Sequence, residues 1–523
     1  MKKNITSCCL ILAFSLILFF YWGSQKRGMF IDENYTYLLS NSQYGDVKID
    51  STGKVILANP IISREMFLNL LEVQEDNRFD AKSVYLNQTK DVHPPLYYWL
   101  INFCSSLFPN SHSKWIGLGL NCLIYSLLII MLFLLSLTMF ESRKYAIIGT
   151  CLYSLCTVGL STALFIRMYV LSALFTTSLA YLFMRLLKGN QRWYIYLLIV
   201  FVFWLGLMTH YYFILYASFV CLSFIIYEIA NKEYKLAYTI IICALLGTVL
   251  MVVSYPAVIS HLFNNQLVSG GNAVSNICNI KSWPGKIARY CYHIVIPLLV
   301  IVLFALTLFF FLIKNKQKVK LTKQSHDALI VIIPAYATFL IVCIISPVIA
   351  NRYVWNIVPI ALLIIPLFVQ TLSPLLSEKL SEKTISNILI IVLAINGCYT
   401  FIAHPDNLFE SDFQKGRTLS RYKHCNCIFF DDNYIAPLVE DILQLLYFDE
   451  IFLTGNSPKE GIWKHINSSA EENLVVFIDI DNSWSSGFNA PEVLNEIISN
   501  TNYYRPKFLF SNGLSETYVL CRK

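Results

Sequence analysis

Apolar segments separated by short polar stretches fill the chain from about residue 8 to residue 403. Most are close to the roughly 20 residues that a helix needs to cross a bilayer. The segments predicted to span lie near 8–22, 115–140, 146–164, 168–187, 193–211, 213–230, 236–258, 289–313, 328–348, 354–371 and 384–403. The pattern therefore predicts an all-α polytopic membrane protein with about 11 spanning helices.

The first apolar segment has features of a signal peptide, because Lys2 and Lys3 precede a short apolar core. No small-residue cleavage site follows it, and Tyr21-Trp22 is typical of an aromatic anchor at the membrane interface. We therefore expect a retained helix.

Two further segments are apolar but too short to span. Residues 95–108 begin with aromatic side chains, and residues 60–71 place apolar residues at helical spacing beside charges. We expect residues 95–108 to form an interfacial or re-entrant helix on the outer surface, and residues 60–71 to form a second interfacial helix in the first outer loop. If 95–108 crossed the membrane, every later loop would change sides and the basic loops would face outward.

Lysine and arginine are concentrated in alternate loops, which lie at 141–144, 185–192, 231–235, 314–323 and 378–383. The positive-inside rule places these loops and the N-terminus in the cytoplasm. Residues 23–114, residues 259–288 and everything after about 404 are then outside. We expect a multi-pass protein of the inner (cytoplasmic) membrane.

The composition changes after residue 404. Three short apolar runs at 427–430, 450–453 and 473–478 are typical of buried strands, and helical patterns lie at 434–447 and 490–499. Residues 507–510 and 517–521 are predicted to close the sheet as a hairpin. The C-terminal part is therefore predicted to be a small soluble α/β domain outside the membrane. Its strand-end aspartates, such as Asp431 and Asp479, resemble a metal or nucleotide site, but we interpret them as capping and turn residues because no glycine-rich phosphate loop is nearby.

Composition supports the membrane assignment. Hydrophobic residues make up 56% of the 523 residues and charged residues 14%, and the mean hydropathy is +0.55. Several of the 15 cysteines lie in apolar runs, where they behave as small hydrophobic residues. The net charge of +7 is modest and fits membrane topology better than nucleic-acid binding.

Ionisable residues near one predicted membrane face indicate a functional site. Asp32 and Glu33 follow the first apolar segment, and Asp91 and His93 close the first outer loop. Arg167, His210 and Arg352 lie at the outer ends of apolar segments, next to the aromatic residues Tyr169, Tyr211 and Tyr353. Each cation alone could be a snorkelling or interhelical group, but their convergence on one face favours function.

Such a set suits glycosyl transfer from a lipid-linked sugar. Asp32 can take the proton of an acceptor hydroxyl as it attacks the anomeric carbon. Glu33 would orient the acceptor or raise the pKa of Asp32. Arginine and histidine would bind the departing lipid phosphate, a histidine doing so most strongly while protonated. Donor affinity should then fall as pH rises through the histidine range.

The motifs around these residues, among them 30–35, 91–98, 167–169, 209–212 and 352–359, resemble those of the bacterial dolichyl-phosphate-mannose protein mannosyltransferase family. This is glycosyltransferase family 39, with lipid A aminoarabinose transferase as a cousin. The resemblance covers about residues 10–400. It implies a C-type glycosyltransferase fold with juxtamembrane helices, a polyprenyl-phosphate sugar donor, and Asp32 as the catalytic base.

The chain also departs from the family's pattern. His93 occupies the position that holds a lysine in the aminoarabinose transferases, which leaves a phosphate-binding role open. The large lumenal domain of eukaryotic relatives has no counterpart here, so the resemblance does not imply a protein acceptor. We expect no cofactor; a divalent metal held by Asp91, His93 and His210 is an alternative without support from ligand spacing.

These observations predict a transmembrane glycosyltransferase domain at 1–403 and an extracytoplasmic α/β domain at 404–523. Its partners are expected to be a polyprenyl-phosphate-linked sugar, membrane lipid and an extracytoplasmic acceptor, which is a glycolipid, a glycan or a protein, with no nucleic acid. A polytopic transporter or lipid flippase is the alternative, because membrane-embedded charges also mark permeation paths. A third hypothesis is a catalytically silent polysaccharide-assembly subunit that keeps the fold. The presence of both Asp32 and Glu33 argues against it. The charges gather at one surface and no internal repeat is visible, which favours the enzyme.

Overall fold

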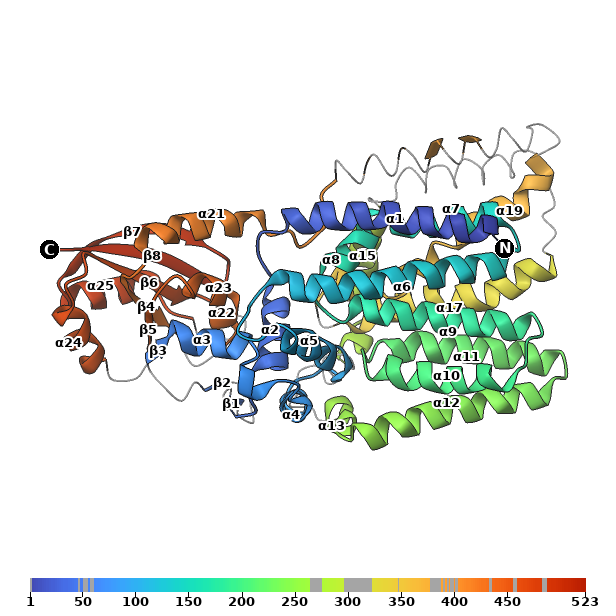
Figure 1. Ribbon diagram of the computed structural model, residues 1–523, viewed down its shortest axis with the longest axis horizontal. Helices are drawn as coiled ribbons and strands as arrows, with labels where there is room; N and C mark the ends of the chain where they lie inside the picture. The colour runs from blue at the N-terminus through green and yellow to red at the C-terminus, as the bar shows by residue number, and fades with distance from the viewer. Residues whose placement is uncertain are drawn as a thin grey trace. The chain divides into compact units, whose positions relative to one another are not determined.

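The computed structural model describes residues 2–45, 48–49, 55–56, 61–263, 275–295, 322–346, 348–376, 403–431, 435–454, 459–481 and 487–523, with isolated positions between 387 and 399. They form two compact units (Figure 1). The helical unit comprises Met1–Ser24, Val92–Tyr97 and Leu118–Asn407, and the sheet unit comprises Gln25–Asp91, Tyr98–Gly117 and Leu408–Lys523. This division groups Gln25–Asp91 and Tyr98–Gly117 with the C-terminal sheet. The domain boundary predicted between residues 403 and 404 stays a prediction.

Six helices in the described residues are long and apolar enough to cross a membrane. They are α1 (Lys2–Gln25), α6 (Lys114–Phe140), α9 (Tyr169–Leu187), α11 (Phe213–Ala230), α12 (Tyr234–Ser254) and α17 (Lys323–Ile345). Each coincides with a segment predicted from hydropathy. Most of the predicted span 289–313 and of the span 384–403, and the middle of the predicted outer loop 259–288, lie outside the described residues.

The predicted span 146–164 is broken. It forms α7 (Arg143–Ser154) and α8 (Thr157–Leu164), which are bent by 58°. The Cys156 sulfur caps α8 by accepting from the Gly159 backbone N–H at 3.3 Å. A Cβ at Gly159 would overlap the Tyr153 carbonyl, so the bend depends on glycine there.

Two other predicted spans are shorter than expected. Residues 193–211 form α10 (Trp193–Leu207), because a turn replaces the helix from Met208 onward. Residues 354–371 form α18 (Val358–Ala361) and α19 (Ile364–Leu376) after the 3-10 turn η4 (Asn351–Val354). Shorter helices α13 (Ala257–Phe263) and α15 (Trp283–Val295) follow α12, and η2 (Ile280–Ser282) precedes α15. Within this unit α10 packs beside α9 and α12, and α11 packs beside α12 and α17.

The predicted C-terminal α/β domain is present as a six-stranded mixed sheet in the order β3-β5-β4-β6-β8-β7. Its strands are β4 (Asn426–Phe430), β5 (Glu450–Thr454), β6 (Asn473–Asp479), β7 (Tyr503–Ser511) and β8 (Ser515–Arg522), joined by β3 (Ile61–Ser63) from the N-terminal part. Strand β4 runs parallel to β5 and β6, whereas β7 and β8 form the predicted antiparallel hairpin. The helices are α21 (Glu410–Leu419), η5 (Ser420–Tyr422), α22 (Ile435–Glu440), α23 (Ile442–Leu445), α24 (Glu460–Ser468) and α25 (Ala490–Asn500).

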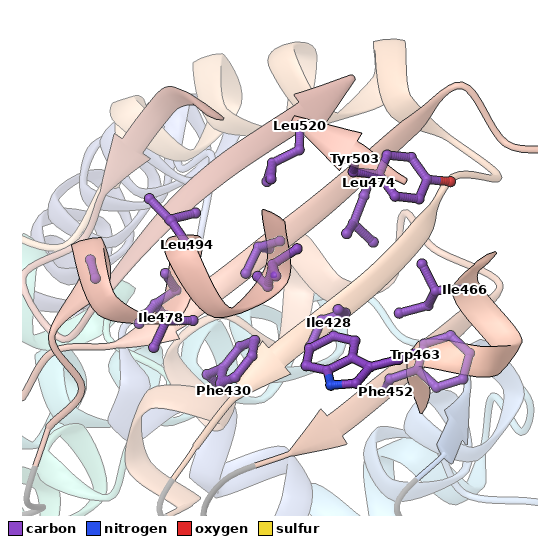
Figure 2. Close-up of a cluster of buried hydrophobic side chains, with 14 residues drawn as sticks. Ile428, Phe430, Phe452, Trp463, Ile466, Leu474, Ile478, Leu494, Tyr503 and Leu520 are labelled. Carbon is purple, nitrogen blue, oxygen red and sulfur yellow. The ribbon is translucent and has the colours of Figure 1, made fainter. Parts of the chain in front are cut away.

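The core of this sheet lies under α24 and α25. Figure 2 shows Ile428 and Phe430 of β4 and Leu474 and Ile478 of β6 with Trp463 of α24. Successive strand residues point to opposite faces, so Phe429 stacks on Phe477 on the other side at 5.8 Å. Both faces are therefore covered, which accounts for the continuous apolar runs.

The rest of the sheet unit comes from the N-terminal part. It contains α2 (Ile31–Asn41), α3 (Arg64–Leu71), η1 (Glu75–Asn77), α4 (Ala81–Gln88), α5 (Leu96–Ser106) and a two-stranded pair, β1 (Lys48–Ile49) with β2 (Val55–Ile56). The helix predicted at 60–71 begins only at Arg64, because Ile61–Ser63 pairs with β5 and the Ser63 hydroxyl caps the helix. The 11 residues of α5 rise about 16 Å, too little to cross a bilayer, as predicted for 95–108.

Candidate functional site

The predicted base lies at the start of a helix in the sheet unit. Asp32 is the second residue of α2 and is half-buried. A carboxylate in the first turn is stabilised by the free N–H groups of the helix. The Asp32 side chain therefore lies beside a helix N-terminus and keeps part of its surface exposed to solvent.

Glu33 occupies a different environment from its neighbour. Its carboxylate is fully buried and forms an ion pair with the fully buried Lys26 at 2.9 Å. The same carboxylate oxygen accepts the Phe30 backbone N–H at 2.8 Å. Glu33 therefore ties the start of α2 to the segment before it.

The helical unit gathers residues from four predicted motifs. The His93 and His210 rings are 6.2 Å apart, and the Tyr169 ring is 5.4 Å from His210. Beyond His210, the Tyr212 ring contacts Tyr353 at 5.6 Å. We call the set of His93, Arg167, Tyr169, His210, Arg352 and Tyr353 the cation cluster.

Other motif residues build the turns that carry the cation cluster. The Leu96 N–H donates to the Met208 carbonyl at 3.1 Å, which joins the segment after His93 to the turn that contains His210. The Tyr97 hydroxyl donates to Asn121 at 2.8 Å. Asn121 in turn donates to the carbonyls of Ala163 and Phe165 and so fixes the turn before Arg167.

Arg167 and His210 are both buried. Burial lowers the pKa of His210 to about 3, and the neighbouring His93 and Arg167 side chains act in the same direction. The His210 Nδ1 atom accepts the Tyr212 N–H at 3.1 Å, so the neutral ring carries its proton on Nε2. The lowered pKa favours a neutral His210 with an Nε2–H donor, and the pH dependence of donor affinity expected from the sequence stays a prediction.

The third cation is placed by the turn between α17 and α18. The Arg352 guanidinium lies over the Tyr353 ring at 5.4 Å. Trp355 follows and packs edge-on against Tyr169 at 5.9 Å. The Arg352 guanidinium is thus held against an aromatic ring, and Trp355 links the same turn to Tyr169.

Two predicted residues have other surroundings. Asp91 is half-buried in the turn after α4, where its N–H donates to the Gln88 carbonyl at 3.1 Å. The Tyr211 hydroxyl bonds the Nδ1 atom of His261 at 2.8 Å. The roles predicted for Asp91 and Tyr211 stay predictions.

The cation cluster lies at one end of the helical unit. Arg167 precedes α9 and His210 precedes α11, so two helix N-termini, which favour anions, begin there. At the other end of α9, Lys188 pairs with Glu141 and lies 4.0 Å from Asp327. The 19 residues of α9 separate these ends by about 28 Å, close to the thickness of a hydrocarbon core.

Three residues were not foreseen from the sequence. Lys26 pairs with Glu33, His261 with Tyr211, and Trp355 with Tyr169. In the sequence, Lys26 is only a charge that follows the first predicted span, and His261 lies in the predicted outer loop 259–288. Among the described residues, no group of three histidine, cysteine, aspartate or glutamate side chains is arranged to hold a metal ion.

A first prediction concerns His210. We expect His210→Ala to weaken donor binding by about tenfold, the loss typical of one hydrogen bond to a charged group, and His210→Gln to retain more because it keeps an N–H donor. Because burial lowers the pKa of His210 to about 3, this residue should not change charge between pH 5 and 8 in the donor-free protein. Equilibrium donor binding across that range is the measurement. A fall in affinity with rising pH that His210→Gln removes would contradict the neutral assignment.

Comparison with known proteins gives one family match. A model described as dolichyl-phosphate-mannose-protein mannosyltransferase matches residues 92–259. No curated protein sequence matches the chain. Two similar solved structures are ArnT from Cupriavidus metallidurans bound to undecaprenyl phosphate and the same protein in the apo state.

The bound form is 10% identical, with a TM-score of 0.49 over 98% of this chain and 97% of that one. The apo form is 10% identical, with a TM-score of 0.44 over 93% and 96%. At this level the likeness identifies no residue role.

The matched residues 92–259 contain five of the predicted site residues: His93, Arg167, Tyr169, His210 and Tyr211. The resemblance to the dolichyl-phosphate-mannose protein mannosyltransferase family, predicted from these motifs, is thereby confirmed over that part of the chain.

Proposed function

We propose that the protein is an integral-membrane glycosyltransferase that moves a hexosyl or pentosyl group from a polyprenyl phosphate to an acceptor outside the cytoplasmic membrane. The family match and the apolar helices support the enzyme class and the lipid-linked donor. The proposal also includes the acceptor, which is a glycolipid, a glycan or a protein. It further includes the inner-membrane location and the orientation.

The observation that carries the proposal is the cation cluster. Its residues come from separate turns of the helical unit, yet ring contacts connect His93, His210 and Tyr169, and the charge of Arg167 acts on His210. Buried cationic and N–H groups beside helix N-termini suit an anion. For a glycosyltransferase with a polyprenyl-phosphate donor, that anion is the lipid phosphate.

Because the leaving group is a phosphate, its departure depends more on stabilisation by cations than on protonation by a general acid. The donor is a phosphodiester with about one negative charge, and cleavage of the bond from C1 to the phosphate oxygen leaves a monoester with close to two. Charge therefore grows on the leaving group in the transition state, where Arg167 and Arg352 stabilise it. The acceptor oxygen bonds to C1, and its proton passes to the Asp32 carboxylate.

The proposed orientation makes a second prediction. A cysteine at Ser111, in the turn after α5, should react with an impermeant thiol reagent added from outside, once interfering native cysteines are removed. A cysteine at Ser142, between α6 and α7, should react only after the membrane is opened. Labelling of intact cells or oriented vesicles measures this. The reverse pattern would invert the proposed topology.

The function itself is tested with purified protein and a polyprenyl-phosphate sugar. Release of free polyprenyl phosphate together with a glycosylated acceptor supports the proposal. A donor that stays intact in the presence of acceptor contradicts it.

A further inference from the structure

The segment that leads into α2 is held by the C-terminal domain. The Arg27 N–H donates to the Leu408 carbonyl at 2.7 Å, and the Phe30 ring stacks on the Phe409 ring at 6.0 Å. At Gly28 the backbone lies so close to Asp412 that a Cβ would overlap the aspartate side chain. Three contacts thus fix the residues just before Asp32.

A buried ion pair completes this attachment. Lys26 and Glu33 have no exposed side-chain surface, and their charged atoms are 2.9 Å apart. The Lys26 ammonium also lies 5.2 Å from the Phe409 ring, and the Lys26 carbonyl accepts from the Lys114 ammonium. The pair therefore joins the first turn of α2 to the segment that the C-terminal domain holds.

The next turn of α2 touches the same domain. The side-chain amide of Asn34 donates to the Val439 carbonyl of α22 at 2.9 Å, and α22 packs along α2. Asp32 lies between these anchored positions, one residue before Glu33 and two before Asn34. The C-terminal domain therefore contacts both flanks of the residue that we propose as base.

A buried ion pair is a costly way to gain stability. Two desolvated charges often stabilise the fold no more than a well-packed apolar pair does. They do restrict the orientation of the side chains that carry them. Here the restricted orientation of Glu33 fixes how the first turn of α2 is rotated about the helix axis, because the Glu33 oxygen that binds Lys26 also accepts the Phe30 N–H.

We propose that the C-terminal α/β domain and the Lys26–Glu33 pair are a positioning device for Asp32. This inference rests on the proposed function, since it assigns how the base of that reaction is held. Glu33 is then a positioning residue rather than a second catalytic carboxylate. Loss of this positioning is expected to lower kcat and to leave donor binding by the cation cluster unchanged.

The test compares Lys26→Met with the double variant Lys26→Met/Glu33→Gln in the purified full-length protein. The single variant removes the ammonium that faces the buried Glu33 carboxylate and should lower kcat by at least about tenfold with little change in donor KM. The double variant should recover to within about threefold of wild type, because the glutamine oxygen still accepts the Phe30 N–H and no unpaired charge remains.

A double variant no more active than Lys26→Met would overturn the positioning role, since catalysis would then need the Glu33 carboxylate itself. Unchanged kcat with a raised donor KM in the single variant would overturn it as well. Asp32→Asn serves as the reference. If Asp32→Asn is fully active, both the base assignment and this proposal fail. If it is inactive and the double variant is not rescued, this proposal alone fails.

A second variant keeps the test independent of the folding of Lys26→Met. Gly28→Ala places a methyl group against Asp412 and should lower kcat with donor KM unchanged. Gly461→Ala in α24 is the matched control, because a Cβ there meets no atom within 4 Å. Equal kcat values for the two alanine variants would overturn the claim that this contact places Asp32.

Discussion

Replacing Asp32 with asparagine is expected to lower kcat by about 10²–10⁴-fold, the usual contribution of a general base. The amide has the same shape and fits the half-buried first turn of α2, so folding and donor binding should persist. It cannot take the proton of the acceptor hydroxyl. Turnover of purified protein on a polyprenyl-phosphate sugar is the measurement.

A matched control is available in the same unit. Asp76 is exposed in the 3-10 turn η1, and Asp76→Asn removes one carboxylate without touching α2. It should leave kcat unchanged. Near-wild-type activity of Asp32→Asn would remove the base assignment.

Donor binding is expected to weaken by about 10- to 100-fold in Arg167→Ala and in Arg352→Ala, which corresponds to the roughly 1.5–3 kcal/mol of a hydrogen bond to a charged group. Lysine at either position should rescue only partly, because it restores the charge without the planar fork of the guanidinium. Titration of donor binding in detergent or nanodiscs measures the change.

Arg185 provides the control for this pair. It lies in the last turn of α9, at the end opposite Arg167, and bonds the Tyr181 hydroxyl at 2.6 Å. Arg185→Ala should keep wild-type donor affinity. If Arg167→Ala and Arg352→Ala also keep it, the arginines serve packing, and the donor phosphate must bind elsewhere.

Hydropathy predicted the spanning helices well because length and apolarity are local properties. The six long helices coincide with predicted segments, whereas the break between α7 and α8 does not appear in the pattern. That break depends on the approach of Tyr153 to Gly159, a contact between turns that no window average contains. The strands β4, β5 and β6 were predicted because both of their faces are buried, which makes them continuous apolar runs.

Contacts between residues far apart in the sequence could not be predicted from local patterns. Ile61–Ser63 was expected to begin a helix, yet it joins the edge of a sheet formed by residues far along the chain. Similarly, the motifs identified Glu33 but not Lys26, since the two lie seven residues apart, which is not a helical contact spacing. The chain between Lys26 and Glu33 folds back at the start of α2, where the Phe30 N–H also binds the Glu33 carboxylate. The lowered pKa of His210 likewise follows from burial and from the neighbouring His93 and Arg167, which the sequence alone does not show.

The most direct test of the central claim uses purified protein in detergent micelles, where no compartments exist and transport has no meaning. A polyprenyl-phosphate donor with an isotope-labelled sugar is mixed with a lipid and glycan extract from cells that lack the protein. Mass spectrometry should then show one acceptor species heavier by a single labelled sugar, with an equal amount of polyprenyl phosphate released, and neither product with Asp32→Asn. A donor that remains intact with every acceptor fraction, in a preparation that binds it, would contradict the account.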